Sequence, residues 1–343
     1  MAFSFGVMPA AAKEAFRSRR LPEQGVYELD TVSLSGISLL TRGNVALSSL
    51  ATRMPEGLLS KDFELLGNPV REITELAVLI TGTGERVWGH WLVDFLPKLY
   101  LLEKAGFDPS TLSFLWPCSV RPFAGKLMQT FGIKPHQLLP YDPQKETLRL
   151  ARLLVPTILH NHLNASPVFA EAANFLSARL GAIGTESEGE KIFLARGDGN
   201  RSLLGRERIT AIMAARGFRV LRPETLPIAA QFDLFRSARI VAGEYGSAMH
   251  GTMFSPLGTV VFALHGNDLH PGFLQTGIGA ALGQPTGYVF GEPGSKPNRF
   301  AITESDLESG LDAAETLAAT RSVDLSDKVH RPMPLIETLY QRP

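Results

Sequence analysis

Apolar and polar positions alternate along this chain in a pattern typical of a mixed α/β protein. From residue 75 onward, short apolar runs typical of buried strands alternate with longer segments that carry apolar residues at helical spacing. Strands are predicted at 76–80, 114–116, 148–155, 191–195, 218–221, 240–242, 259–264 and 287–290. Helices are predicted at about 89–106, 123–131, 167–180, 204–216, 227–236, 273–282 and 304–319. Such alternation indicates a parallel α/β sheet.

Two α/β domains are predicted, because a small, polar and acidic segment, GAIGTESEGE, occupies residues 181–190 and is typical of a linker or surface loop. We expect the first domain at 1–180, the second at 190–320, and a C-terminal tail at 321–343. Residues 1–70 show no clear pattern beyond candidate short strands within 31–38 and 45–52. The second domain has the pattern of a nucleotide-binding fold, in which ligands bind at the carboxyl ends of the strands.

The segment 239–254, RIVAGEYGSAMHGTMF, is central to the second domain. An apolar strand is followed by a turn of small residues and then by a predicted helix from Met249. This arrangement directs backbone N–H groups and the positive end of a helix toward an anion. Gly243 and Gly246 would also let the backbone approach a phosphate closely. The alternative is that these glycines only form a tight strand-to-helix turn.

Charged side chains follow two other predicted strands of the second domain. Arg196 and Arg201 follow strand 191–195, and Arg222 and Glu224 follow strand 218–221. Two arginines beside a glycine turn would clamp a diphosphate, because a guanidinium offers forked donors and stays charged. Glu224 is a candidate acceptor for ribose hydroxyls. The alternative for each arginine is a solvated surface position, and the absence of G-x-G-x-x-G disfavours a dehydrogenase.

A second candidate pair lies in the first domain. His90 and Asp94 are four residues apart and share one face near the start of a predicted helix. Pro97 predicts a kink, or the point at which the helix proper begins. The pair suits acid–base chemistry, because histidine titrates near neutrality and a carboxylate orients it or accepts a proton. The alternative is a structural hydrogen bond at the helix start, and two ligands alone are too few for a metal site.

The amino-acid composition limits the classes of partner and site that we expect. The 343 residues include 34 Lys+Arg and 34 Asp+Glu, so no overall positive charge favours nucleic acid as a partner. The single cysteine, Cys118, excludes an intrachain disulfide and a cysteine zinc cluster, as expected of a cytoplasmic protein. No run approaches the roughly 20 apolar residues that span a bilayer. Apolar residues precede the basic ones at the N-terminus, unlike a secretory signal, which leaves only a weak peripheral membrane contact open.

Three segments together resemble glycosyltransferase family 61, a group that includes bacterial capsular-polysaccharide proteins. They are HWLVDFLPKL at 90–99, FLARGDGNRSLLGRE at 193–207, and the stretch from GFRVLRPETL to GTMFSPLGTVV at 217–261. The resemblance implies a GT-B-like fold with two Rossmann-like α/β domains facing a cleft, the acceptor domain first. It also implies inverting, metal-independent sugar transfer from a nucleotide-sugar donor to a glycan acceptor, with no DxD motif and no further cofactor. Cytoplasmic action, at the inner face of the cell membrane, fits this activity.

The resemblance also assigns residues. The family's N-domain motif matches His90 and Asp94, and its donor-binding positions match Arg196, Arg201, Glu224, Gln231, Gly246 and Ser247. With Gly243, Tyr245 and Ala248 these are the predicted donor-binding residues. The arginines and the 246–248 backbone would stabilise the leaving diphosphate. Asp94 is the first candidate base, and His90 the second.

Three positions depart from the family pattern. Tyr245 stands where the family usually has histidine, and a tyrosine does not titrate near neutrality. Gly205 and Gly251 stand where asparagine is common, so side-chain hydrogen bonds are lost. These departures leave altered donor choice or lost activity open. Two rival functions are therefore a non-catalytic glycan- or nucleotide-binding partner in a polysaccharide assembly complex, and a nucleotide-sugar epimerase of the same fold.

Overall fold

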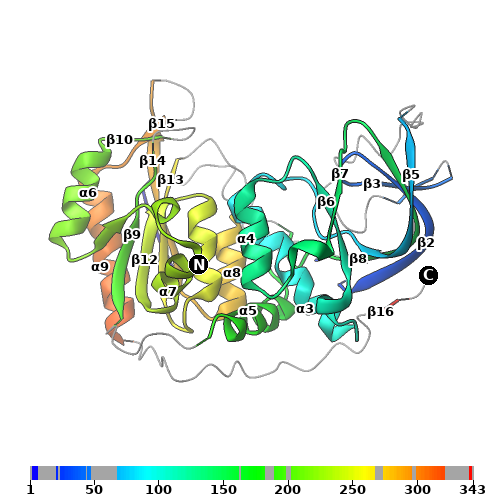
Figure 1. Cartoon of the computed structure of the whole chain (residues 1–343). Helices are drawn as coiled ribbons and strands as arrows, with labels where there is room; N and C mark the ends of the chain where they lie inside the picture. The colour runs from blue at the N-terminus through cyan, green and yellow to red at the C-terminus, as the bar shows by residue number, and fades with distance from the viewer. Residues whose placement is uncertain are drawn as a thin grey trace. The chain divides into compact units, whose positions relative to one another are not determined.

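The computed structural model describes residues 2–6, 21, 24–43, 45–47, 68–161, 164–181, 189–197, 202–266, 273–295, 299–320 and 340–341. The chain divides into two compact units (Figure 1). Unit 1 comprises Met1–Leu21 and His160–Arg331, and unit 2 comprises Pro22–Leu159 and Pro332–Pro343. Each unit has its own β-sheet, and both sheets contain parallel and antiparallel strand pairs. The predicted mixed α/β fold is confirmed.

The sheet of unit 1 has the order of a doubly wound fold. Its central strands are β9 (Glu190–Leu194), β11 (Arg219–Leu221), β12 (Ala238–Glu244), β13 (Val260–Gly266) and β14 (Thr286–Pro293). They lie in the order β11-β9-β12-β13-β14, and every neighbouring pair is parallel. Numbered along the chain this order is 2-1-3-4-5, so the direction of winding reverses between β9 and β12. Ligands of such sheets bind at that switch point.

Three shorter strands extend the far side of this sheet. The N-terminal β1 (Phe3–Gly6) pairs parallel with β14, and β15 (Arg299–Ala301) pairs antiparallel with its end. The third, β10 (Ser202–Leu204), pairs parallel with β15. The sequence pattern did not predict β1. The ring of Phe3 lies 6.0 Å from that of Phe262, so this terminal segment packs against the core of unit 1.

Helices cover both faces of the sheet of unit 1. Figure 1 shows α6 (Arg206–Ala215) and α9 (Glu304–Thr320) on one side, and α5 (Pro167–Arg179), α7 (Ile228–Arg236) and α8 (Leu274–Leu282) on the other. Met213 of α6 and Leu311 of α9 join Phe193 and Phe262 of the strands in one buried cluster. Because α5 packs against α8, the division between the units falls before α5, whereas the composition of 181–190 suggested a boundary after it.

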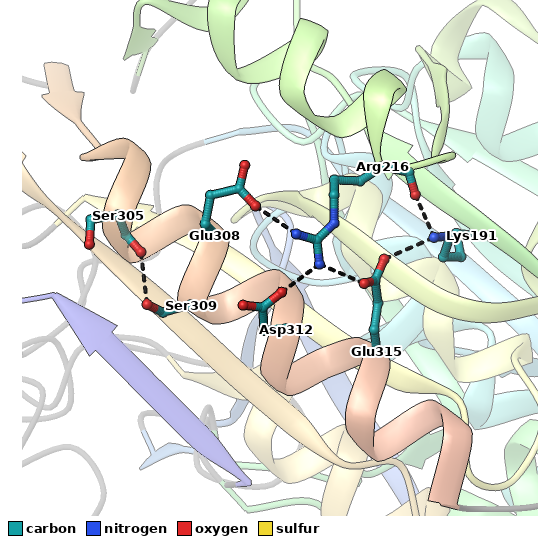
Figure 2. Close-up of polar contacts among 7 residues, drawn as sticks. All are labelled: Lys191, Arg216, Ser305, Glu308, Ser309, Asp312 and Glu315. Carbon is teal, nitrogen blue, oxygen red and sulfur yellow. Dashed lines mark hydrogen bonds and ion pairs between the residues drawn. The ribbon is translucent and has the colours of Figure 1, made fainter.

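Ion pairs hold α9 against the rest of unit 1 (Figure 2). Arg216, which follows α6, donates to Glu308 at 2.7 Å and to both Asp312 and Glu315 at 2.6 Å. Lys191 of β9 donates to Glu315 at 2.9 Å and also to the Arg216 carbonyl. The hydrogen bonds that the Arg216 guanidinium donates to Glu315 and Asp312 raise its pKa above the ordinary value. Three carboxylates of α9 therefore meet around one guanidinium, and Lys191 of β9 joins the network through Glu315.

The sheet of unit 2 is mixed. Its strands are β2 (Val26–Ser35), β3 (Leu39–Arg42), β4 (Val45–Ala46), β5 (Val70–Val78), β6 (Ser113–Pro117), β7 (Leu138–Tyr141), β8 (Thr147–Pro156) and β16 (Tyr340–Gln341). The order is β4-β3-β2-β8-β5-β6-β7, with β16 beside β2. The pairs β8–β5, β5–β6 and β6–β7 are parallel, while β2 pairs antiparallel with β8 and β3. The strands predicted after residue 75, which are β5, β6 and β8, pair in parallel as expected. The antiparallel pairs all involve β2, β3 or β4, whose order the sequence did not predict, and a short turn at Gly36 joins β2 to β3, as only antiparallel neighbours allow.

The helical segment after β5 has three parts: α2 (Trp88–His90), a π-helical turn η2 (Trp91–Phe95) and α3 (Pro97–Lys104). The Leu96 N–H donates to the Trp91 carbonyl, which is the wider π spacing. The prediction that the helix proper begins at Pro97 is confirmed. The same unit contains α4 (Pro122–Thr130) and the short 3₁₀ turns η3 (Pro109–Thr111) and η4 (Pro135–Gln137). In the part of the chain that the structure describes, no helix has the length and apolarity to cross a bilayer.

Candidate functional site

The first candidate site lies at the switch point of unit 1. Strands β9 and β12 are parallel neighbours, with Leu194 opposite Gly243, so the segments that follow them leave the same edge of the sheet. Arg196 follows β9, and its Nη1 donates to the carbonyl of Tyr245, which follows β12, at 3.3 Å. The Arg196 backbone N–H donates to Oε1 of Glu244, also at 3.3 Å. The structure thus brings Arg196 together with the loop that the sequence analysis made central.

Gly246 allows this close approach. A Cβ at this position would lie 3.0 Å from Nη1 of Arg196, so the guanidinium packs directly on the glycine backbone. Its φ of 163° is ordinary extended backbone, which means that space rather than conformation requires glycine here. Gly243 has a different role. It lies inside β12, where a Cβ would be 2.9 Å from the Leu194 side chain, so the prediction that the turn begins at Gly243 is wrong.

The end of β12 also carries a buried ion pair that the sequence analysis missed. The Glu244 side chain is 1% exposed and accepts hydrogen bonds from Arg206 Nε at 2.8 Å and Nη2 at 3.2 Å. Arg206 is the first residue of α6. A carboxylate beside an anion site would repel the anion, and the forked contact from Arg206 neutralises it. The only sequence signal was a charged residue at the end of an otherwise apolar strand.

The segment after Gly246 differs from its prediction. It forms a 3₁₀ helix, η6 (Ser247–Phe254), where the sequence predicted an α-helix from Met249. The Met249 N–H donates to the Gly246 carbonyl, and Ser247 and Ala248 are half-buried at the start of η6. A 3₁₀ helix has tighter winding and poorer hydrogen-bond geometry than an α-helix. The α-helix dipole argument therefore applies to this segment only in weakened form.

The Tyr245 side chain packs with aromatic residues of β13 and β14. Its ring centroid lies 4.7 Å from His265 and 6.4 Å from Tyr288, and the residue is 8% exposed. His265 stacks on Phe273 at 5.0 Å. Burial, and then the neighbouring Tyr245, raise the pKa of Tyr288, whose hydroxyl lies 2.8 Å from that of Thr276. Tyr245 is therefore part of an aromatic cluster.

The remaining predicted donor-binding residues are placed differently. Glu224, in the 3₁₀ turn η5 (Pro223–Thr225), is exposed and binds Arg222 at 2.9 Å. That arginine lies against the loop after β9, since a Cβ on Gly197 would be 2.3 Å from its Nη2. Gln231 is buried on α7, and its amide donates to the Leu226 carbonyl at 3.0 Å. Arg201 lies outside the described residues.

The second candidate site is in unit 2. His90 Nδ1 and Asp94 Oδ2 are 2.5 Å apart, the Asp94 side chain is 1% exposed, and that of His90 is 29% exposed. Gly84, with φ of 98°, packs on the imidazole, where a Cβ would lie 2.5 Å from Cδ2 of His90. The buried carboxylate thus orients a half-exposed imidazole. The hydrogen bond of the structural alternative is present, and its geometry also suits an acid–base pair.

Lys98 was also missed. It lies one helical turn beyond Asp94, is fully buried, and its Nζ lies 3.5 Å from the Leu79 carbonyl at the end of β5. Burial lowers the pKa of Lys98 to about 8, while the charge of Asp94 acts in the opposite direction. The signal was a lysine between Pro97 and Leu99, inside an otherwise largely apolar segment.

Gly205 and Gly251, the two glycines at positions where the sequence analysis expected asparagine, lie in different local environments. Gly205 precedes α6 with φ of 67°, and nothing lies within 4 Å of its notional Cβ. Asparagine also tolerates this left-handed region. A Cβ on Gly251 would lie 2.0 Å from the Phe235 ring of α7. At position 251, glycine is therefore required by packing.

A comparison with models of known protein families gives a match. A family model, described as Glycosyltransferase 61, matches residues 88–262. This region contains His90, Asp94 and the ends of β9 and β12. No curated protein matches the chain. Among the described residues, no group of three or more His, Cys, Asp and Glu side chains is arranged to hold a metal ion.

Proposed function

Because the chain belongs to glycosyltransferase family 61 and is therefore a transferase, we propose that it moves a sugar from a nucleotide-diphosphate donor to a glycan acceptor. We further propose that the transfer inverts the anomeric carbon, needs no metal ion and serves polysaccharide biosynthesis. A GT-B-type arrangement, with unit 1 as the donor unit and unit 2 as the acceptor unit, completes the proposal. The two α/β units support it, and action in the cytoplasm stays a prediction.

The observation that carries the proposal is the contact of Arg196 with Tyr245 and Gly246 at the switch point of unit 1. In the reaction the bond between the anomeric carbon and the diphosphate oxygen breaks, and negative charge develops on the leaving diphosphate. A fixed guanidinium beside backbone groups stabilises such a charge without reorganisation. Arg206 is paired with Glu244. Of Arg196 and Arg206, Arg196 is therefore the one whose positive charge can act on the donor.

We assign the acceptor side to His90 and Asp94. The acceptor hydroxyl must lose its proton as its oxygen attacks the anomeric carbon. The sequence-based ranking put Asp94 first, but its side chain is 1% exposed while that of His90 is 29% exposed. These exposures favour the reverse order: His90 Nε2 accepts the proton, and Asp94, bound to Nδ1, fixes the tautomer and stabilises the imidazolium.

The test is turnover with a panel of UDP-, GDP- and dTDP-sugars, followed as donor hydrolysis or transfer, with and without EDTA. We expect at least one donor to react, EDTA to leave the rate unchanged, and Arg196→Ala to lower kcat/KM at least tenfold. Arg219→Ala is the matched control, because this exposed arginine begins β11 at the opposite edge of the sheet. Full activity of Arg196→Ala would show that the donor site is elsewhere, and no turnover of any donor would overturn the proposed reaction.

A further inference from the structure

Three ionisable side chains follow one another at four-residue intervals along the helical segment after β5. His90, Asp94 and Lys98 belong to α2, η2 and α3. Their exposure falls along the series, from 29% for the His90 side chain to 1% for Asp94 and 0% for Lys98. The series thus runs from solvent at the imidazole to the interior of unit 2 at the ammonium group.

Besides Asp94, Lys98 has an aromatic ring and a backbone carbonyl close to its ammonium group. Its Nζ lies 5.6 Å from the centre of the Phe95 ring and 3.5 Å from the Leu79 carbonyl. Asp94 is the charged group that acts on it among the described residues. Among the described elements that pack against α3, β8 carries the exposed arginines Arg149 and Arg152, which pair with Glu72 and Glu28 and, as cations, supply no countercharge. Asp108, which precedes η3, is exposed and accepts hydrogen bonds from Ser110.

A buried ammonium and a buried carboxylate each carry a large desolvation cost, which falls when the two face each other. Asp94 therefore favours the charged form of Lys98, and Lys98 favours the charged form of Asp94. With a pKa of about 8, Lys98 is mostly protonated at pH 7 and loses its charge slightly above that pH. The positive charge of Lys98 is thus present at pH 7 and can be removed at mildly alkaline pH.

We propose that Lys98 is a positioning residue that sets the ionisation of the His90–Asp94 pair by holding a positive charge one helical turn from the Asp94 carboxylate. A charged Lys98 keeps Asp94 ionised, so that Asp94 accepts the Nδ1 proton of His90 and leaves Nε2 as the base. Loss of this positive charge raises the proton affinity of both partners. The catalytic meaning of this inference rests on the proposed function, but its first test does not.

The first test is an NMR pH titration of the full-length protein with ¹⁵N-labelled histidine, in which His90→Gln assigns the His90 signals. We expect the wild-type His90 shifts to show a second, smaller step near pH 8, caused by deprotonation of Lys98. Lys98→Met should remove this step and raise the apparent pKa values of the His90–Asp94 pair by about one unit. Lys98→Arg should also remove the step, while leaving the pair at its wild-type values, because arginine stays charged.

Lys104→Met is the matched control, because Lys104 ends the same helix but is half-exposed and lies over the Tyr100 ring. It should leave the His90 titration unchanged. If the wild-type protein shows no step near pH 8, the inference is overturned even where the Lys98 variants fail to fold. An unchanged pair titration in folded Lys98→Met would overturn it as well.

The second test uses whichever sugar nucleotide of the donor panel reacts. We expect Lys98→Arg to keep the wild-type pH profile of kcat/KM, and the acid limb to move upward by about one unit in Lys98→Met. A merely structural role of Lys98 would lower the rate at every pH without moving the acid limb, and that result would contradict the inference. Absence of turnover would refute the proposed function, while the NMR titration would still decide the role of Lys98.

Discussion

Arg206 holds the carboxylate of Glu244 with two hydrogen bonds, at 2.8 and 3.2 Å, at the end of the central strand β12. The Glu244 side chain is 1% exposed and that of Arg206 is 20% exposed. The same carboxylate accepts the backbone N–H of Arg196. This pair therefore connects the start of α6 with both strand ends that form the candidate donor site.

We expect Arg206→Met to lower the free energy of unfolding by about 3 kcal/mol, because it leaves a buried carboxylate without its countercharge. Urea denaturation measures the effect. The double variant Arg206→Met with Glu244→Gln should recover part of the loss, since it removes the uncompensated charge. A change below about 0.5 kcal/mol in the single variant would mean that the pair contributes little.

Gly246→Ala tests whether the position of Arg196 matters for donor turnover. The new methyl group would lie 3.0 Å from Nη1 of Arg196, so the guanidinium must move by a few tenths of an ångström. We expect kcat/KM to fall by about tenfold, since small misplacements at a reacting centre cost this much or more. The melting temperature should stay close to wild type because the φ of 163° suits alanine. Gly125→Ala, where no atom lies within 4 Å, is the control for the same change at an open position.

The alternation of the central strands and the helices from residue 191 onward could be predicted, because each of these strands is an apolar run and each helix has apolar residues at helical spacing. The short strands β10 and β15 lack such a run and were not predicted. The approach of Arg196 to the loop after β12 also followed, since parallel strands end at one edge. The Arg206–Glu244 pair did not, because it joins residues 38 positions apart through side-chain geometry that no local pattern encodes. Lys98 was missed because lysine is rarely buried, and only its tertiary contacts reveal that it is.

The strands of residues 26–46 were predicted only in part, since the candidates within 31–38 and 45–52 overlap β2 and β4 without giving their bounds or order. The sequence of β2, VYELDTVSLS, mixes buried and exposed positions irregularly, since its burial pattern is set by pairing with β8 and β3. Propensity alone gives little signal for such a strand, because strand preferences depend on context. The 3₁₀ form of η6 likewise depends on its packing against α7 and α8.

Gly205 and Gly251 should respond differently to substitution by asparagine. Gly205→Asn should be tolerated with a melting temperature near wild type, because the position is open and asparagine accepts left-handed backbone. Gly251→Asn should lower the free energy of unfolding by at least about 2 kcal/mol, because the side chain would collide with the Phe235 ring. Thermal denaturation compares the two variants. Equal effects would contradict the packing explanation for position 251.

Acid should weaken the attachment of α9. Although burial raises the pKa of Glu315, hydrogen bonds from Arg216 and Lys191 bring it below its ordinary value. A lowered pKa in the folded state contributes stability above about pH 4.3, the pKa of an unfolded glutamate, and this contribution is lost as the pH falls through the folded pKa. We expect Arg216→Met to cost about 1 kcal/mol at pH 7 and less at pH 3, measured by urea denaturation. Arg219→Met, which removes one exposed ion pair, should change little at either pH.

Lys98 should make the protein more stable as the pH rises above about 8. Its pKa is about 8 in the folded protein and about 10.4 in an unfolded chain, so between these values the unfolded state binds more protons. Stability therefore rises with pH across this window. The free energy of unfolding of the wild type, minus that of Lys98→Met, should be constant below pH 8 and then increase by about 3 kcal/mol up to pH 10.4. Lys104→Met should show no such slope, and a constant difference for Lys98→Met would mean that Lys98 keeps its ordinary pKa.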